Sequence, residues 1–339
     1  METSISQEIL LIHLLHFSHS LKCYPEKYIP LIFQDNITPP LHHAYVCPLC
    51  LKKAIIVDQT GLYMTAEFSL DHFPPESSGG KLKILVCKKC NNEAGTLYDY
   101  SIKQKLQYIS FDRKIPSSSL TAKSEITNVK GWYHSNLNVR EDGEIEISFK
   151  PNPKKKFPLL DSWIDKSKDD LNWKANLTFR TPDDEKVSKA LLKAAYLYCF
   201  INWGYEFVYS AHGELIRNVL SDSAKYPITV PSFWLDNDVK REETFTIPIG
   251  LCFIQRPMAW QSFVINLPLT SKDTGYNCTV SILIPNSTEK GIEDLIKIQK
   301  LLDSKPECEV SFVPLKNFLE EKIYDGYTKT WESVKKEFG

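Results

Sequence analysis

The chain lacks both a long apolar run and an excess of charge of one sign. Its longest apolar stretch near the start, residues 9–15, is interrupted by His13, whereas a transmembrane helix needs about 20 apolar residues. The 41 Lys and Arg residues are balanced by 42 Asp and Glu residues, for a formal net charge of -1. This balance excludes a uniformly basic surface, so a nucleic-acid-binding surface would have to be a local patch. The chain starts Met1–Glu2 without the basic segment of a secretory signal, and we expect a cytoplasmic protein.

The chain also lacks the common nucleotide-binding and nucleophile motifs. It has no glycine-rich phosphate loop ending in Lys, no nucleophile elbow, no internal repeat and no low-complexity tract. We therefore expect no ATP-driven activity. The composition, with 42% hydrophobic and 24% charged residues, is that of a folded globular protein. A length of 339 residues suits two domains, or one domain with large additions.

Local patterns predict an α+β protein in three parts. Residues 1–44 are expected to be a helical extension, and residues 45–108 a compact module. Residues 109–125, rich in Ser, Lys and Pro, are expected to connect this module to an α+β domain with an antiparallel sheet at 126–339. Because the C-terminal part has enough apolar sequence for a core of its own, we expect it to fold as a separate unit.

The alternation of apolar and polar residues predicts the elements of each part. In the module, we expect strands at 54–57 and 63–70 and a helix that starts near Asn91. In the C-terminal part, we expect a β-hairpin at 131–139 and 144–150, helices at 183–200, 214–220 and 291–302, and strands at 245–255, 261–267, 277–284 and 309–313.

Four of the nine cysteines form two Cys-x-x-Cys pairs, Cys47/Cys50 and Cys87/Cys90. Each pair offers two thiolates from one tight turn, and two pairs complete the tetrahedron that zinc prefers. The alternative is four unrelated thiols, but the other cysteines all stand alone in the sequence. We therefore expect a structural zinc ion that braces a module too small to bury much core of its own. The isolated cysteines are expected to be buried small apolar side chains: Cys23, Cys199, Cys252, Cys278 and Cys308.

Between the two cysteine pairs, a predicted strand ends in an adjacent acid and imidazole. The prolines that follow bend the chain, so both side chains could serve one phosphate instead of pointing to opposite faces. A strand-end hydrogen bond is the alternative role for this pair. The pattern reads Asp71-His72-Phe73-Pro74-Pro75, then Gly79-Gly80, then Cys87-Lys88-Lys89-Cys90-Asn91-Asn92. It resembles the HNH endonucleases, which are ββα-metal (His-Me finger) nucleases, and is most similar to their zinc-containing HNH-endonuclease-5-like group, over about residues 45–105.

This resemblance implies an HNH ββα-metal fold and a catalytic site within the module. It assigns His72 as the general base, Asp71 as a carboxylate ligand of a divalent cation, and Asn91 as the second ligand. Because the last residue of the family motif is Asn here, and Asn92 is adjacent, Asn92 is the alternative ligand. The C-terminal domain would then position the substrate or regulate access to it.

These residue types suit phosphodiester hydrolysis irrespective of the family. An imidazole with a pKa near about 6.5 can take a proton from water at neutral pH. A hard cation held by a carboxylate and an amide oxygen neutralises charge on the phosphate; Mg²⁺ suits these ligands, and Mn²⁺ can replace it. The family's middle Asn is replaced by Leu82 or Lys83, so its supporting role is unfilled or supplied by another residue.

A cluster of lysines beside the motif offers a surface for phosphate contact, although solubility explains such residues equally well. The cluster consists of Lys81, Lys83, Lys88 and Lys89. We expect double-stranded DNA as the substrate, with RNA as the open alternative, in a role such as restriction or phage defence. The rival hypothesis is a non-catalytic zinc knuckle that binds DNA or a protein partner, and the missing middle Asn favours it. A second copy of the chain or a partner protein could bind through the C-terminal domain.

Overall fold

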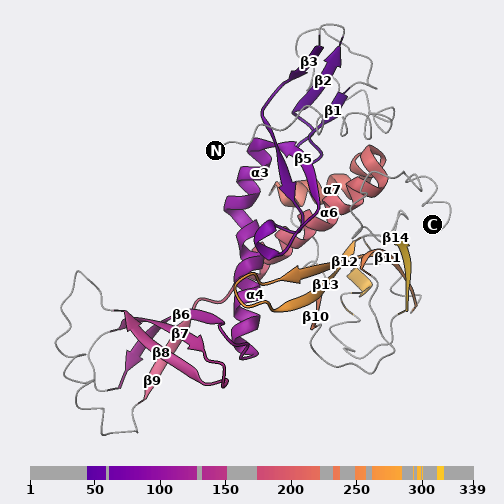
Figure 1. The fold of residues 1–339 in the computed structure, drawn as a ribbon. Coiled ribbons are helices and arrows are strands. Elements are labelled where there is room, and N and C mark those ends of the chain that lie inside the picture. The colour runs from indigo at the N-terminus through magenta and orange to yellow at the C-terminus, as the bar shows by residue number, and fades with distance from the viewer. Residues whose placement is uncertain are drawn as a thin grey trace. The chain divides into compact units, whose positions relative to one another are not determined.

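The computed structural model describes residues 44–58, 61–127, 132–150, 174–221, 232–236, 249–256, 262–284, 293, 296–298, 300 and 311–316. The chain forms two compact units, and each is interrupted along the sequence (Figure 1). Unit 1 contains Met1–Ile102, Asp184–Leu269 and Asn277–Gly339. Unit 2 contains Lys103–Asp183 and Thr270–Tyr276.

Unit 1 begins with two small antiparallel sheets and a helix. Strands β1 (Ala44–Val46), β2 (Ala54–Asp58) and β3 (Gly61–Met64) form one sheet in that order, and β4 (Phe68–His72) pairs with β5 (Lys83–Cys87) in the other. Helix α3 (Lys88–Ala94) follows β5 directly and continues through a π-helical turn at Gly95–Asp99 into α4 (Tyr100–Asp112). Three consecutive residues of β5, Ile84, Leu85 and Val86, are fully buried, so both faces of this strand are covered.

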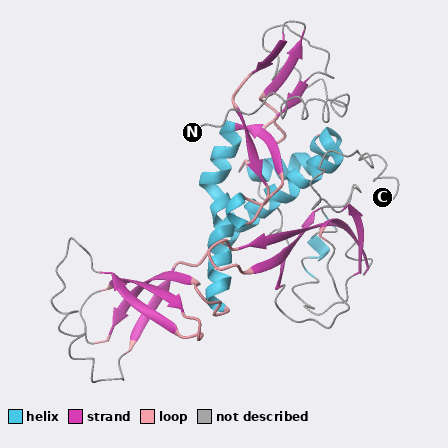
Figure 2. Ribbon diagram, in the orientation of Figure 1, coloured by secondary structure: helices cyan, strands magenta, loops and turns pink. Residues whose placement is uncertain are grey.

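The long helix α6 (Asp184–Val208) supplies much of the core of unit 1, and Figure 2 shows it in cyan with α3 and α7 (Ala211–Leu220). Tyr196 Oη donates to the Pro48 carbonyl at 2.7 Å, and the Val46 amide donates to Tyr205 Oη at 2.7 Å. Near its end α6 kinks at Gly204, where φ is 59° and ψ is -148°, a conformation open to glycine because it has no Cβ. Helix α6 therefore packs directly against β1 and the turn that follows it.

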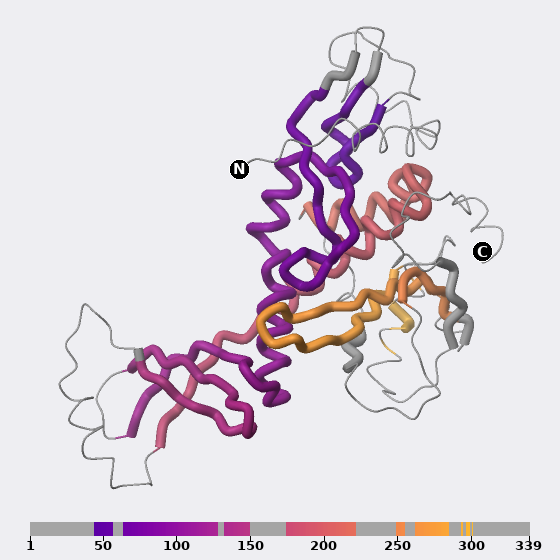
Figure 3. The backbone as a smooth tube through the Cα atoms, viewed as in Figure 1, coloured from indigo at the N-terminus to yellow at the C-terminus, as the bar shows by residue number. Residues whose placement is uncertain are grey.

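A five-stranded sheet completes unit 1, in the order β10 (Ser232–Asp236), β13 (Asn277–Ile284), β12 (Phe263–Thr270), β11 (Gly250–Arg256) and β14 (Ser311–Lys316). The pairs β10–β13, β11–β12 and β11–β14 are antiparallel. Strands β12 and β13, orange in Figure 3, are largely buried. Trp203 of α6 packs against Phe263 of β12 with ring centroids 5.0 Å apart, so the helix and the sheet share apolar contacts.

Unit 2 contains a four-stranded antiparallel sheet in the order β8 (Ile145–Lys150), β7 (Tyr133–Val139), β6 (Ser119–Ile126) and β9 (Ala175–Phe179). Strand β6 alternates between exposed and buried residues, and Ala122, Ser124 and Ile126 are buried. The hydroxyl of Ser124 forms a hydrogen bond with that of Ser135 on β7. A buried serine pair thus occupies strand positions where an apolar pair is usual.

The prediction of an α+β fold with antiparallel sheets is confirmed, and the hairpin expected at 131–139 and 144–150 is present as β7 and β8. The helix expected at 183–200 continues to Val208. The single strand expected at 63–70 is two strands, β3 and β4, in different sheets. The expected connector at 109–125 is wrong in part, because α4 runs to Asp112 and β6 starts at Ser119. The N-terminal helix and most of the helix at 291–302 lie outside the described residues.

The two units divide the chain differently from the expected boundaries of 45–108 and 126–339. Residues 184–269 group with the N-terminal residues, whereas residues 126–183 belong to unit 2. The buried side chains of α6, which bond to β1 and its turn, are the physical reason for this grouping. Within the described part of the chain, no helix has the length and apolar character that crossing a membrane requires.

Candidate metal centre and active-site cavity

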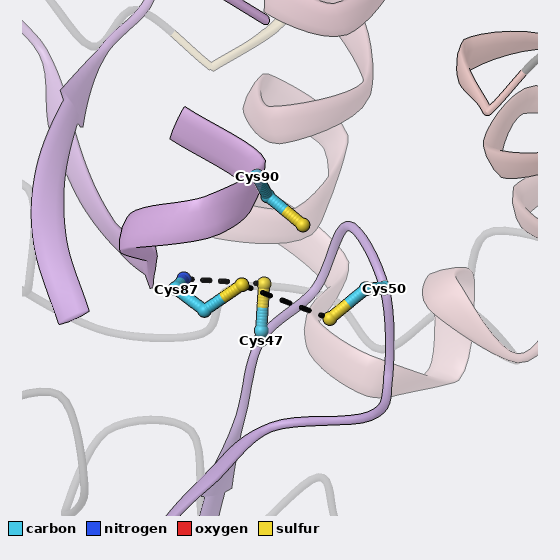
Figure 4. Close-up of side chains that lie close together, drawn as sticks. All are labelled: Cys47, Cys50, Cys87 and Cys90. Carbon is cyan, nitrogen blue, oxygen red and sulfur yellow. Dashed lines mark hydrogen bonds between the residues drawn. The ribbon is translucent and has the colours of Figure 1, made fainter. Parts of the chain in front are cut away.

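Four cysteine side chains converge where the turn after β1 meets the start of α3 (Figure 4). Cys47 and Cys50 lie in that turn, Cys87 ends β5, and Cys90 lies in the first turn of α3. Their sulfur atoms all lie within 4.8 Å of one another, and the sulfurs of Cys50 and Cys87 are 3.9 Å apart. Zinc–sulfur bonds of about 2.3 Å give a tetrahedron with edges of about 3.8 Å. The cluster could therefore hold one metal ion such as zinc.

Backbone amides of the surrounding turns already point at these sulfur atoms. The Cys87 amide donates to Cys47 Sγ at 3.3 Å, and the Lys52 amide donates to Cys50 Sγ at 3.4 Å. Hydrogen bonding with Cys47 lowers the pKa of the Cys50 thiol, whereas burial raises the pKa of Cys47. Four thiols this close cannot all ionise without a cation among them, and a metal binds them as thiolates. The amide donors favour that thiolate form.

A second group of polar side chains surrounds a cavity of about 290 Å³ beside the β4–β5 hairpin. Asp71 and His72 end β4, Asn91 belongs to α3, and Asp99 ends the π-helical turn; all of them line the cavity. Asn91, Gly95 and Asp99 also follow one another at intervals of four residues, which places them on one helical face. The cavity therefore brings together the three residues to which the resemblance assigns catalysis, and their roles stay predictions.

The loop between β4 and β5 explains the prolines and glycines of the motif. The Gly80 amide donates to the Pro75 carbonyl at 3.2 Å, and a Cβ added at Gly80 would collide with the Pro74 carbonyl. The Phe73 amide donates to the Leu82 carbonyl at 3.1 Å, which continues the hairpin ladder. This tight loop requires glycine at position 80, and Leu82 contributes its backbone to the hairpin while its side chain offers no amide.

A buried lysine joins two carboxylates of this cavity. Lys193 Nζ, on α6, lies 2.9 and 3.2 Å from the two carboxylate oxygens of Asp71 and 2.6 Å from Asp99 Oδ2. Lys193 is 0% exposed, Asp71 4% and Asp99 8%. We call Asp71, Lys193 and Asp99 the buried triad. With both carboxylates ionised and the ammonium charged, its net charge is negative, so the cavity wall carries one more anion than cation.

The charges of the buried triad depend on one another. Burial raises the pKa of Asp71 and that of Asp99, and the neighbouring Lys193 ammonium offsets part of each shift. Burial alone would lower the pKa of Lys193, but the two carboxylates outweigh it, and the pKa of Lys193 lies above its ordinary value. The ammonium is therefore held charged by the two acids, and each acid relies on it as its counter-charge.

Two oxygen atoms at the cavity have no hydrogen bond from the described residues. Asp99 Oδ1 is buried and unpartnered. The Asn91 amide nitrogen donates to Ser69 Oγ at 2.9 Å and to the Leu70 carbonyl at 3.4 Å, which leaves its carbonyl oxygen for another partner. Carboxylate and amide oxygens are the donors that Mg²⁺ and Mn²⁺ prefer. These residues therefore fit a hard divalent cation, whereas Asn92 is exposed and does not line the cavity.

The four predicted phosphate-binding lysines differ in their partners. Lys88 pairs with Glu67 at 2.9 Å, and Lys89 lies 3.7 Å from Glu93. Lys81 and Lys83 are exposed, and Lys83 lies directly opposite His72 in the β4–β5 register. Among the described residues, no acidic side chain pairs with either of these two. Lys81 and Lys83 are therefore the lysines best placed to meet a phosphate beside the cavity.

Sequence reasoning missed Lys193 and Asp99, although each carries a signal. Lys193 stands alone in the otherwise apolar run Ala190–Phe200, and a lone charge on a buried helix face requires a partner. Asp99 continues the four-residue spacing from Asn91, but nothing in the sequence pairs it with a lysine so far along the chain. No protein-family model, no curated protein and no solved structure matches this chain.

Proposed function

We propose that this protein is a metal-dependent HNH endonuclease that hydrolyses phosphodiester bonds of DNA. One observation carries the proposal: a base, a carboxylate and an amide that the HNH pattern requires, His72, Asp71 and Asn91, line a single cavity. They do so on a strand pair followed directly by a helix, β4–β5–α3, whose junction holds the four-cysteine cluster. This order of elements and ligands is the one that the resemblance implies.

In the proposed reaction, each residue has a distinct task. His72 is half-buried at the cavity, where its imidazole takes a proton from the attacking water. Asp71 and Asn91 hold a Mg²⁺ or Mn²⁺ ion. When bound, this cation neutralises negative charge on the phosphate and on the leaving oxygen. Lys83, opposite His72 on β5, and Lys81 bind the DNA backbone as it enters the cavity.

The four cysteines are proposed to hold one structural zinc ion through Cys47, Cys50, Cys87 and Cys90. The sulfur spacing and the two amide–sulfur hydrogen bonds support this assignment. Zinc bound there would tie the turn after β1 to the start of α3, which carries Asn91. The metal would thus hold one wall of the cavity in place, and its loss would disturb catalysis without touching the reacting atoms.

A second candidate function is a zinc knuckle that binds DNA or a protein and does not cut. The ion pair between Lys193 and Asp71 favours it, because an ammonium already neutralises the carboxylate that the HNH pattern assigns to the cation. The presence of His72 at the same cavity favours catalysis, since a protein that only binds has no chemical use for a base beside two acids.

Nicking of supercoiled plasmid by the full chain in Mn²⁺ separates the two candidates. Replacement of His72 by Ala should lower the rate by about 10²–10⁴-fold, because removal of a general base costs that much. His134→Ala is the matched control, since His134 is exposed on β7 of unit 2, and it should cleave like the wild type. Equal cleavage by both variants would exclude His72 as the base, and a wild-type protein that binds DNA without cutting it would favour the zinc knuckle.

A further inference from the structure

The buried triad changes which oxygen atoms are free at the cavity. Both oxygens of Asp71 accept from the Lys193 ammonium, at 2.9 and 3.2 Å. Asp99 gives only Oδ2 to the same ammonium, at 2.6 Å, and its Oδ1 has no hydrogen-bond partner among the described residues. A carboxylate oxygen that is buried without a partner carries a substantial desolvation cost. The unsatisfied anionic oxygen of the triad therefore belongs to Asp99.

The position of Asp99 makes this oxygen available to a ligand in the cavity. Asp99 lines the cavity with Asp71, His72 and Asn91, and is itself only 8% exposed. It follows Asn91 on the same helical face, with Gly95 between them. A Cβ added at Gly95 would meet nothing within 4 Å, so the space between these two side chains is open. A cation that bound the free Asn91 carbonyl oxygen would lie on this same face of the helix.

Charge supports the same conclusion. Two carboxylates and one ammonium leave the triad one negative charge in excess, and Lys193 is fixed in the buried core of α6. A divalent cation is the group that neutralises such a site most effectively, because buried excess charge is costly in a medium of low polarity. Lys193 would then hold Asp71 and Asp99 at a fixed separation from each other.

We infer that Asp99 is a direct ligand of the catalytic divalent cation, through Oδ1, and that Lys193 is a positioning residue that orients Asp99 and Asp71. This inference rests on the proposed function and adds a ligand that the HNH pattern does not contain. Asp71 contributes to the cation site with its remaining lone pairs, while Asp99 supplies the unshared carboxylate oxygen. The site is thereby built from both the hairpin and the π-helical turn.

The test is a Mn²⁺ titration of the zinc-loaded full chain without DNA, in which free Mn²⁺ is followed by electron paramagnetic resonance. Asp99→Asn should weaken Mn²⁺ binding by at least the tenfold or so that loss of a supporting group costs. It keeps the size of the side chain and leaves Lys193 paired with Asp71, so it should still fold. Asp112→Asn is the control, because Asp112 is an exposed acid further along the same helical segment, and its Mn²⁺ affinity should equal that of the wild type.

Plasmid nicking by the same variants distinguishes a ligand from a merely structural residue. With Asp99→Asn, the Mn²⁺ concentration for half-maximal cleavage should rise, and excess Mn²⁺ should restore part of the rate while zinc content stays unchanged. Unchanged Mn²⁺ affinity in Asp99→Asn, in a wild-type protein that binds Mn²⁺ and cuts, would overturn this inference and leave the proposed function intact. Failure of the wild type to bind Mn²⁺ at all would overturn both.

A second variant decides the question if Asp99→Asn does not fold. Asp99→Glu keeps the charge that Lys193 requires but moves the carboxylate by one methylene. If Asp99 is a ligand, this displacement should change the Mn²⁺ affinity severalfold. An affinity equal to that of the wild type in folded Asp99→Glu would count against direct ligation.

Discussion

Replacement of Lys193 by Met should destabilise unit 1 strongly. The variant keeps the length and apolar stem of the side chain and removes only the charge. Asp71 and Asp99 would then face each other at 4% and 8% exposure without the ammonium that now lies 2.6–3.2 Å from three of their oxygens. Removal of one partner from a buried ion pair costs about 3–5 kcal/mol, because the remaining charge stays desolvated. We expect a loss of about that size in the free energy of unfolding.

Urea unfolding followed by tryptophan fluorescence measures this loss, since Trp203 is buried in α6. With a urea dependence of about 3 kcal/mol per M, a loss of about 3–5 kcal/mol lowers the midpoint by about 1–1.7 M. Lys186→Met is the matched control, because Lys186 is exposed on the same helix and surface replacements cost within about 0.5 kcal/mol.

A neutral triad provides the complementary test. Replacement of an entire buried charge cluster by neutral side chains is often neutral in stability. The triple variant Asp71→Asn, Asp99→Asn, Lys193→Met should therefore recover most of the loss of the single variant. If Lys193→Met unfolds within about 1 kcal/mol of the Lys186→Met control, which is the size of ordinary surface effects, the three side chains do not form a buried ion cluster.

Three further outcomes are expected. Cys87→Ser should abolish zinc content in elemental analysis and unfold the strands around the cluster, because the metal contributes directly to folding; a folded, zinc-loaded variant would contradict the four-cysteine assignment. The double variant Lys81→Ala, Lys83→Ala should weaken DNA binding and reduce the slope of log affinity against log salt by about 0.9 for each phosphate that the lysines neutralise, and an unchanged slope would place the DNA elsewhere. A fragment that ends at residue 125 should unfold without cooperativity in urea, because it lacks α6 and the hydrogen bonds from α6 to β1; a cooperative transition would show that the module folds alone.

The sequence predicts those parts of the site whose residues lie close along the chain or form a known pattern. The two Cys-x-x-Cys pairs carry their own geometry, and the cluster at Cys47, Cys50, Cys87 and Cys90 has the size that their spacing suggests. The β7–β8 hairpin follows from alternation around a single turn at Gly143, where φ is 81°. In each case the information is local.

The buried triad could not be predicted because its partners lie far apart in the sequence. Lys193 is separated from Asp71 by 122 positions and from Asp99 by 94. The charge pattern shows that Lys193 needs a partner but not which acid provides it. The same limit explains why α6 was expected in a separate domain, because apolar periodicity reveals a buried face without naming what covers it. Strand β6 was missed for another reason, since the buried Ser124 gives no apolar signal.

The most direct test of the central claim is a crystal structure of the full-length His72→Ala protein with duplex DNA and Mn²⁺. Anomalous scattering locates zinc and manganese separately. The account predicts a zinc peak among the four cysteine sulfurs, and a manganese peak together with one DNA phosphate in the cavity lined by Asp71, Asn91 and Asp99. DNA bound at another surface, with neither manganese nor phosphate in this cavity, would contradict the assignment of the protein as an HNH endonuclease.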